Sequence, residues 1–154
     1  MRDLPVPQPY GLTHLQFSSN LTPQMANPLQ NTLLIRVRYP EVDAMGYLHH
    51  SRFLQYFELG RVELLRAMGV SYADLERQGI FFVVTKAEVR YKAPARYDDE
   101  LTLTTTVIKQ THVRYDHAYA LHRGDQLLAE GTTTIACVGR DGSVQKIPES
   151  LGGM

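Results

Sequence analysis

The feature that most constrains this fold is a change of period at Ile80. Before it, apolar side chains recur every three or four residues over 51–68, which predicts a long helix. After it, short apolar runs alternate with turn signals such as Gly124-Asp125, which predicts a succession of strands. The expected order is a strand (32–38), the long helix, a short helix (71–78), and then the strands 80–91, 101–107, 112–122 and 127–138, with a short piece at 144–147. Strands joined by short turns pair antiparallel, so we expect an α+β fold whose sheet curls around the one long helix.

The long helix is the element expected at the centre of this fold. Its apolar stripe consists of Phe53, Phe57, Gly60, Leu64 and Met68, widened by Leu54, Val62 and Leu65. A stripe this wide predicts a mostly buried helix. Ser51 is the expected N-cap and Gly69 the expected C-terminal cap. Because glycine inside a helix costs about 1 kcal/mol relative to alanine, Gly60 predicts a close approach of another element.

Residues 1–30 differ in composition from the rest of the chain. They carry five of the eight prolines. Because proline fixes φ and removes a hydrogen-bond donor, neither a helix nor a central strand is expected there. We therefore predict an extended or disordered N-terminal extension over 1–30, or an arm that packs on another subunit. The chain length of 154 residues leaves one folded domain over 31–150.

Charge and composition exclude several classes of function. The chain has 16 basic and 16 acidic side chains, so it has no positive excess with which to bind nucleic acid. Cys137 is the only cysteine and cannot form an internal disulfide. No apolar run is long enough for an integral membrane segment and no signal-peptide pattern is present, so a cytoplasmic location is expected. Since no metal-ligand spacing or glycine-rich phosphate loop occurs, no metal or redox cofactor is expected either.

The stretch 39–50, between the first strand and the long helix, carries the candidate chemistry. It contains an acid at Asp43, a glycine at Gly46 and two histidines, His49 and His50. A loop that leads into a helix N-terminus places ionisable groups beside free backbone N–H donors, which suits chemistry on a carbonyl. The structural alternative is that Asp43 is a turn or capping residue and that His50 is held by hydrogen bonds.

Three segments of the chain, taken in order, match the signature of a known family. The first consists of Asp43-Ala-Met-Gly46, His50, Phe53-Leu-Gln-Tyr-Phe-Glu58 and Arg61. The second consists of Ala87-Glu-Val-Arg-Tyr91 and residues 94–100. The third consists of Ala129-Glu-Gly131, Gly142 and Ile147-Pro148. Over about residues 32–150 the chain resembles the 4-hydroxybenzoyl-CoA thioesterase family of hotdog-fold proteins, and especially its Tol-Pal-associated acyl-CoA thioesterase branch. It departs from that pattern at Met45, His49 and Arg52, which bear on acyl specificity.

The resemblance implies a catalytic site centred on the loop. Asp43 would attack the thioester carbonyl or act as the base for a water, two roles that the sequence does not separate. Gly46 would permit the turn, and His50 would donate to the carbonyl oxygen or orient Asp43. Backbone N–H groups at the start of the helix would stabilise the oxyanion.

Further residues are expected to bind the substrate. Those expected around the acyl group are Met45, Tyr47, Leu48, His49 and Arg52. Those expected near the CoA phosphates are Arg90 and Lys92, with Arg96 and Arg114 as further candidates. Glu58 is a rival catalytic acid on the helix, but we expect it to form a structural ion pair with Arg61 or Arg90.

The resulting prediction is an acyl-CoA thioesterase that acts as a homodimer or homotetramer with its sites at a subunit interface. The alternatives are an acyl-carrier-protein thioesterase, another acyl-thioester enzyme of the hotdog fold, or a non-catalytic acyl-CoA binding protein. The acyl group, whether short aliphatic, long-chain or aromatic, is left open.

Overall fold

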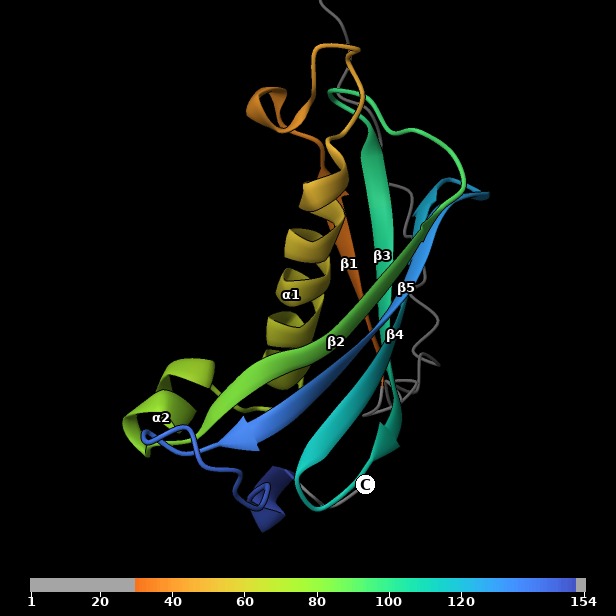
Figure 1. Cartoon of the computed structure of the whole chain (residues 1–154). Coiled ribbons are helices and arrows are strands. Elements are labelled where there is room, and N and C mark those ends of the chain that lie inside the picture. The colour runs from red at the N-terminus through yellow and green to blue at the C-terminus, as the bar shows by residue number, and fades with distance from the viewer. Residues whose placement is uncertain (1–29, 152–154) are drawn as a thin grey trace, which may run out of the picture.

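The computed structural model describes residues 30–151, which form a five-stranded antiparallel sheet with one long helix against it (Figure 1). The elements are β1 (Gln30–Arg36), η1 (Tyr39–Glu41), α1 (His50–Ala67), α2 (Tyr72–Arg77), β2 (Phe81–Tyr91), β3 (Glu100–Gln110), β4 (Arg114–Arg123), β5 (Gln126–Val138) and η2 (Glu149–Leu151). The strand order is β1-β3-β4-β5-β2, so β1 and β2 are the edges of this sheet. The predicted α+β class is confirmed. The predicted extension falls mainly on residues 1–29, which lie outside the described residues.

The strands β3 and β4 carry the buried side chains of the inner face, while the backbone of α1 lies against β1 and β3. Alternate residues of β3 from Leu101 to Val107 are buried, and those between them are partly exposed. The same alternation runs along β4 from Tyr115 to Leu121. Since side chains of a strand point alternately to its two faces, these residues form one inner surface.

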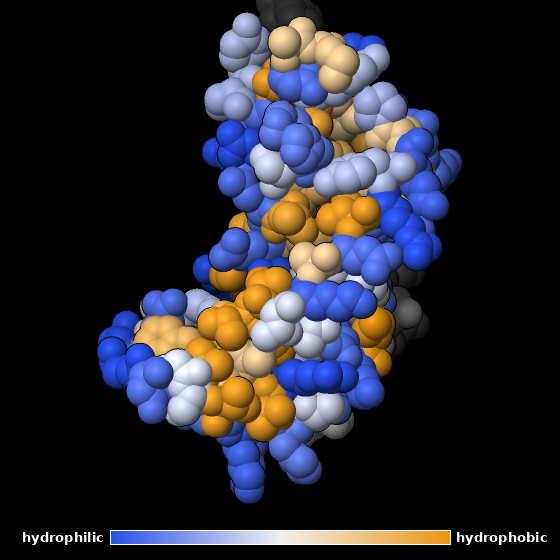
Figure 2. All heavy atoms as spheres, viewed as in Figure 1, coloured by the Kyte–Doolittle hydropathy of each residue, from blue (hydrophilic) through white to orange (hydrophobic). Residues whose placement is uncertain are grey.

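The edge strand β2 is exposed to a much greater extent. Within residues 30–151 it pairs only with β5, and none of its residues is buried. Val83, Val84 and Tyr91 are 42%, 51% and 51% exposed. Figure 2 shows apolar side chains gathered on the side of the molecule that carries β2, α2 and α1. An exposed edge with apolar neighbours is a surface that proteins normally cover.

The helix α1 buries a narrower stripe than the sequence predicts. Its buried residues are Phe53, Tyr56, Phe57, Gly60 and Leu64. Leu54 is 42% exposed and Leu59 is 41% exposed, so the prediction of a mostly buried helix is wrong. Within residues 30–151 no other element fully covers either leucine, and the two lie on different sides of the helix, because they are five residues apart.

The two ends of α1 are fixed in different ways. At the N-terminus the cap is His49 rather than the predicted Ser51, because the Nδ1 of His49 accepts from the Ser51 backbone N–H at 3.3 Å. At the C-terminus the predicted cap at Gly69 is confirmed. Gly69 has a φ of +80°, and the following Val70 N–H donates to the Leu65 carbonyl at 3.0 Å.

Two glycines mark the closest approaches around α1. A Cβ on Gly60 would overlap Thr105 Oγ1 and lie 2.9 Å from Leu103 Cδ2, which confirms the predicted close approach. On β5, a Cβ on Gly131 would lie 2.5 Å from the Phe57 ring and 2.7 Å from the backbone carbonyl oxygen of Glu88. The absence of side chains at these positions lets the helix and the sheet pack directly.

The core is divided into two clusters along α1. One surrounds the N-terminal half of α1 and includes Phe57, and the other surrounds its C-terminal half and includes Leu64. Between them, on adjacent strands β3, β4 and β5, lie the buried polar residues Thr105, His117 and Thr133. We call these three residues the polar row. It crosses the inner face of the sheet beneath the middle of α1.

The last part of the chain differs from the prediction. No strand forms at 144–147, where Val144 makes only an isolated bridge with Val138 before the chain reaches η2. The segment is held instead by single contacts, such as the hydrogen bond from Tyr115 Oη to the Leu151 carbonyl at 2.7 Å. No helix within residues 30–151 is both long and apolar enough to cross a membrane.

Replacing Gly131 with alanine tests the packing of α1 on β5. We expect Gly131→Ala to lower the free energy of unfolding by about 1–3 kcal/mol, because the new methyl group meets a backbone carbonyl that cannot move alone. Urea denaturation measures this. The control is Thr132→Ala at the neighbouring exposed position. Equal stability of the two variants would contradict the close approach.

Candidate functional site

The loop that carries the candidate residues is anchored by a buried carboxylate, Glu41. It is 2% exposed and accepts hydrogen bonds from the Arg38 backbone N–H (2.8 Å), the Arg38 guanidinium (2.6 and 3.1 Å) and Tyr56 Oη (2.7 Å). Burial raises the pKa of Glu41, but these donors outweigh burial and leave the pKa below its usual value. The ionised carboxylate thus ties η1 to α1 through Tyr56.

Asp43 closes a tight turn with one of its two carboxylate oxygens. Its Oδ1 accepts from the backbone N–H groups of Met45 (2.8 Å) and Tyr47 (3.1 Å). Its backbone carbonyl accepts from Gly46 at 2.9 Å, and Gly46 has a φ of +76°, which glycine adopts without strain. Within residues 30–151 the other oxygen, Oδ2, accepts no hydrogen bond. Asp43 is therefore a turn residue through Oδ1, and its Oδ2 remains available for a ligand.

The start of α1, seven residues after Asp43, offers one unused backbone donor. The His49 side chain accepts from the N–H of Ser51, and its carbonyl accepts from Arg52 at 2.9 Å. In the part of the chain described, the N–H of His50, the first residue of α1, has no acceptor. The His50 side chain is exposed, and its carbonyl accepts from Tyr91 Oη at 3.1 Å. A free N–H at a helix N-terminus is a ready site for a carbonyl oxygen or an anion.

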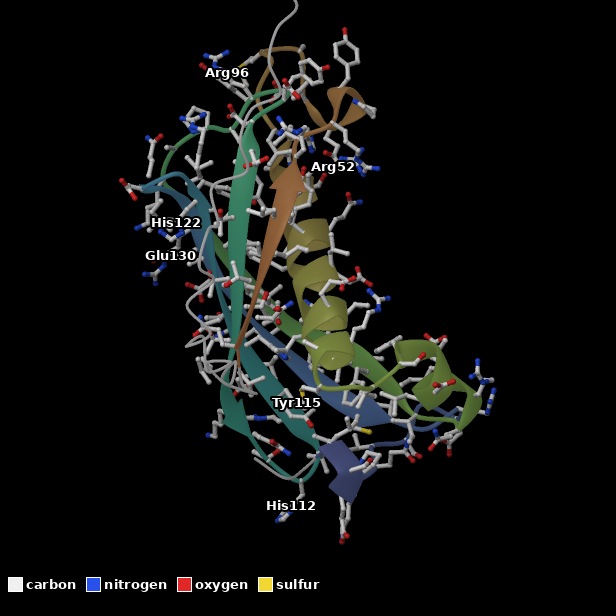
Figure 3. The ribbon with its side chains drawn as sticks, turned by 180° about the vertical axis from the view of Figure 1, so that it is seen from behind. Arg52, Arg96, His112, Tyr115, His122 and Glu130 are labelled. Carbon is white, nitrogen blue, oxygen red and sulfur yellow. The ribbon has the colours of Figure 1, made fainter. Side chains whose placement is uncertain are left out.

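The residues predicted around the acyl group do not share one surface. Met45 is 71% exposed in the turn, whereas Leu48 is packed in the core cluster around the N-terminal half of α1. Arg52 donates to Gln55 Oε1 at 2.7 Å and to the Pro40 carbonyl at 3.5 Å. Figure 3 shows Arg52 apart from Arg96, so the two guanidinium groups face different surroundings.

Tyr47 is brought together with Arg96, a residue that sequence reasoning considered only for the CoA phosphates. The Arg96 Cζ lies 4.6 Å from the centroid of the Tyr47 ring, and its Nη2 donates to Tyr47 Oη at 3.3 Å. Because Tyr47 also donates its N–H to Asp43, this exposed guanidinium is held beside the turn.

The other predicted cations are already paired with carboxylates. Arg90 forms an ion pair with Glu88 at 3.2 Å, and Lys92 forms one with Glu130 at 3.1 Å. All four side chains are substantially exposed, so these pairs contribute little to stability and are exchangeable. Their predicted contacts with CoA phosphates stay predictions.

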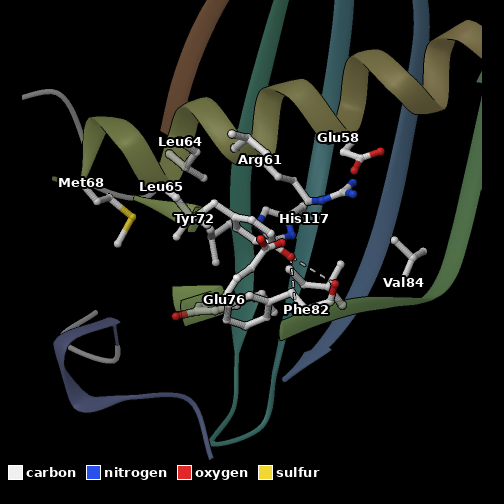
Figure 4. Close-up of a pocket in the computed structure, with 14 residues that line it drawn as sticks. Glu58, Arg61, Leu64, Leu65, Met68, Tyr72, Glu76, Phe82, Val84 and His117 are labelled. Carbon is white, nitrogen blue, oxygen red and sulfur yellow. Dashed lines mark hydrogen bonds between the residues drawn. The ribbon is translucent and has the colours of Figure 1, made fainter. Parts of the chain in front are cut away.

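A cavity of about 360 Å³ lies beneath the C-terminal half of α1 (Figure 4). Its walls are mostly apolar and come from α1, α2 and four strands, including Val62, Leu65, Met68, Phe82, Val84, Val107 and Ile135. Glu58 and Arg61 reach it from α1, and His117 reaches it from β4. The expected ion pair of Glu58 with Arg61 or Arg90 is wrong, because within residues 30–151 Glu58 pairs with neither.

His117 is a buried titratable group in this cavity. It is 4% exposed, and burial, reinforced by the positive charge of Arg61, lowers its pKa to about 4. The imidazole is therefore neutral at pH 7. Its Nδ1 is buried and has no hydrogen-bond partner within residues 30–151. Arg61 donates to Tyr119 Oη at 3.1 Å, which in turn bonds to Thr133 Oγ1 at 2.7 Å.

A comparison with protein families matches residues 37–153 to the thioesterase-like superfamily. The chain belongs to this superfamily. It is 33% identical over 105 residues to the acyl-CoA thioesterase YbgC of Haemophilus influenzae, covering 68% of this chain and 77% of that one. It is also 33% identical over 106 residues to the acyl-CoA thioester hydrolase YbgC of Escherichia coli O157:H7, covering 68% and 78%.

A solved thioesterase structure shares the fold described above. The DHNA-CoA thioesterase of Staphylococcus aureus superposes with a TM-score of 0.72 at 31% identity, covering 77% of this chain and 79% of that one. The predicted hotdog architecture and family resemblance are thus confirmed. Among residues 30–151, no three His, Cys, Asp or Glu side chains converge as metal ligands would. The expectation of no metal or cofactor stays a prediction.

Two residues of this thioesterase-like chain were missed by sequence reasoning. Glu41 gave no signal, because its partner Tyr56 looks like one more member of the helix stripe. The buried position of His117, by contrast, could have been predicted from the sequence. It stands between Tyr115 and Tyr119 in a strand of period two, which places it on the same inner face as those aromatic residues.

The neutral, buried His117 should make the protein sensitive to mild acid. Its folded pKa of about 4 lies below the unfolded value of about 6.5, so only the unfolded state gains a proton between these pH values. We expect the free energy of unfolding to fall as the pH is lowered from 6.5 to 4, with His117 accounting for up to about 3 kcal/mol. Urea denaturation at several pH values measures this. A His117→Leu variant should lose correspondingly less stability over the same range, and an identical pH dependence would contradict the assignment.

Proposed function

We propose that this protein hydrolyses acyl-CoA thioesters to a free acid and CoA. The observation that carries the proposal is that one loop holds both a free Asp43 carboxylate oxygen and, seven residues later, an unused N–H at the start of α1. Membership of the thioesterase-like superfamily and similarity to two proteins named as acyl-CoA thioester hydrolases support it. An acyl-carrier-protein thioester as the substrate and a cytoplasmic location stay predictions.

In the proposed mechanism, Asp43 Oδ2 acts at the thioester carbonyl. It either attacks the carbon, giving an acyl-enzyme anhydride that water then hydrolyses, or removes a proton from the attacking water. On either route, CoA leaves as a thiolate. The Oδ1 hydrogen bonds to Met45 and Tyr47 keep the carboxylate in one orientation while it reacts.

The oxyanion would be stabilised by the His50 N–H. This donor lies at the positive end of α1, where the helix dipole also favours negative charge. Because the Ser51 N–H already donates to the His49 side chain, the proposed oxyanion hole consists of the His50 N–H alone. The exposed Arg96 guanidinium, held by Tyr47, is the best-placed cation for a CoA phosphate.

Replacing Asp43 with asparagine tests the assignment. Asparagine keeps an oxygen that can accept from Met45 and Tyr47, so the turn should survive, but it removes the negative charge. We expect Asp43→Asn to lower kcat/KM by about 100-fold or more, measured as thiol release from a panel of short, long and aromatic acyl-CoAs.

The matched control is Asp141→Asn. Asp141 also uses Oδ1 to accept from a backbone N–H, that of Ser143 at 3.0 Å, but it lies in a different turn. This variant should keep full activity. Undiminished turnover in Asp43→Asn would refute the catalytic role.

We further propose that two copies pair through their β2 edges. In one chain, the cavity lies far from Asp43, since Arg61 is eleven residues beyond His50, or about 16 Å along α1. α1 runs antiparallel to β2, because His50 contacts Tyr91 and Tyr72 of α2 lies beside Phe82. Antiparallel pairing of two β2 strands would therefore set the Asp43 loop of one copy near the cavity of the other. A tetramer would join two such pairs.

A charge on β2 should disrupt this pairing. We expect the protein to have at least twice the 17.5 kDa mass of one chain by light scattering, and Val83→Lys to shift it toward the single-chain mass. Val144→Lys is the control, since Val144 is also an exposed valine but lies after β5. A monomeric wild-type protein would rule out the proposed dimer.

A further inference from the structure

The loop that carries Asp43 is a short hairpin whose base is closed by Glu41. Near the turn, the Asp43 N–H donates to the Tyr47 carbonyl at 2.8 Å. At the base, the His49 N–H donates to the Glu41 carbonyl at 2.9 Å. Glu41 therefore stands two residues before Asp43 in the chain and also holds the residue that precedes the unused His50 N–H. Both halves of the proposed site are connected to this one residue.

The side chain of Glu41 attaches this hairpin to the face of α1. Its partner Tyr56 lies six residues after the start of α1 and is 5% exposed, and the Tyr56 hydroxyl donates to Glu41 at 2.7 Å. Its other partner, Arg38, stands three residues before Glu41, so the Arg38 hydrogen bonds shape only the chain that enters the loop. The bond from Arg52 of α1 to the Pro40 carbonyl is exposed and 3.5 Å long. The buried link between helix and hairpin is therefore the Tyr56 hydroxyl.

Burial prevents water from replacing any of these donors in place. Glu41 is 2% exposed and its pKa stays below the usual value, so its side chain is an ionised carboxylate that can only accept hydrogen bonds. A buried charge that loses a donor is destabilised where it stands. The simplest relief is a movement of the carboxylate toward water, and the backbone of the hairpin moves with it.

We propose that Glu41 and Tyr56 are positioning residues for the thioesterase reaction, because their hydrogen bond fixes the Asp43 hairpin on α1. The fixed hairpin lets Asp43 Oδ2 and the His50 N–H meet the same carbonyl group. Both positioning residues act through these two groups and not on the substrate. A displacement of about 1 Å between reacting groups can lower a rate about 100-fold, so a contact behind the site can control turnover. This inference rests on the proposed function, since it names what assembles that site.

Replacing Tyr56 with phenylalanine tests the inference, because phenylalanine keeps the packed ring and removes only the hydroxyl donor. The substrate is the member of the acyl-CoA panel that the wild-type protein hydrolyses fastest. We expect Tyr56→Phe to lower kcat about tenfold and to leave KM within about twofold, since the acyl-CoA still binds while the reacting groups are misaligned. A merely structural role would lower the stability and leave the kcat of the folded protein unchanged, and that result overturns the inference.

The matched control is Thr134→Val. The Thr134 hydroxyl also donates to a carboxylate, that of Asp116, at 2.8 Å, but both side chains lie on the outer face of the sheet. Valine keeps the branched shape of threonine, so this variant loses one hydrogen bond of the same kind away from the hairpin. It should keep the wild-type kcat and KM. An equal loss of kcat in the control would show that any lost hydrogen bond slows turnover, which also overturns the inference.

A double-mutant cycle shows whether the two residues act as one unit. Glu41→Gln keeps the length of the side chain but removes its charge and one acceptor oxygen, so it should lower kcat at least as much as Tyr56→Phe. Because Tyr56 acts through Glu41, adding Tyr56→Phe to Glu41→Gln should lower kcat by less than about twofold more. A full second loss of about tenfold would overturn the coupling. If Glu41→Gln does not fold, the Tyr56→Phe rates and hydrogen exchange decide the test.

Hydrogen exchange measures the positioning without turnover and separates the two proposals. In Tyr56→Phe the backbone amides of residues 42–49 should exchange about tenfold faster than in the wild type, whereas Thr134→Val should leave them unchanged. Unchanged exchange in Tyr56→Phe overturns the inference. Faster exchange, with no hydrolysis of any acyl-CoA by the wild type, would refute the thioesterase and leave the attachment of the hairpin by Tyr56 confirmed. An active wild type with undiminished kcat in Tyr56→Phe would do the reverse.

Discussion

The buried carboxylate of Glu41 is the interaction on which the geometry of this loop depends. Removing a charge from water is costly, and the cost is offset here only because Arg38 and Tyr56 together supply four hydrogen bonds. One of these partners lies on the chain that enters the loop and the other lies on α1. The rotation of the helix and the position of the loop are therefore set by one network. Burial and the Glu41 charge also raise the pKa of Tyr56, so its hydroxyl stays a donor throughout the physiological range.

Much of the fold could be predicted because it depends on periodic patterns. The change of period at Ile80 correctly separated helix from sheet, and Gly60 correctly marked a close approach. One error arises because a pattern does not say what covers a surface. Leu54 fits the apolar stripe of α1 but faces outward in the described chain. A second error is local: Ser51 is a good capping residue by type, yet α1 begins one residue before it, and the His49 ring accepts from the N–H of Ser51 itself.

The candidate site was predictable only where its parts are close in sequence. Asp43 and Gly46 form one turn, so their association follows from local chemistry. Other contacts at the turn and in the cavity join residues that are distant in the sequence, such as Tyr47 with Arg96 and Arg61 with Tyr119. A single sequence does not reveal which distant residues make contact. The burial of a single loop side chain cannot be predicted from the sequence either. Leu48 stands next to the candidate residues in the chain, but its side chain belongs to the core.

The division of the core by the polar row has a consequence for how such a protein can change over generations. The packing that holds the turn lies in the cluster around Phe57, and the walls of the cavity lie in the other cluster around Leu64. A substitution that reshapes the cavity therefore leaves the contacts behind the turn largely intact. Chains that descend from one ancestor can in this way differ in the cavity while they keep the packing behind the Asp43 turn.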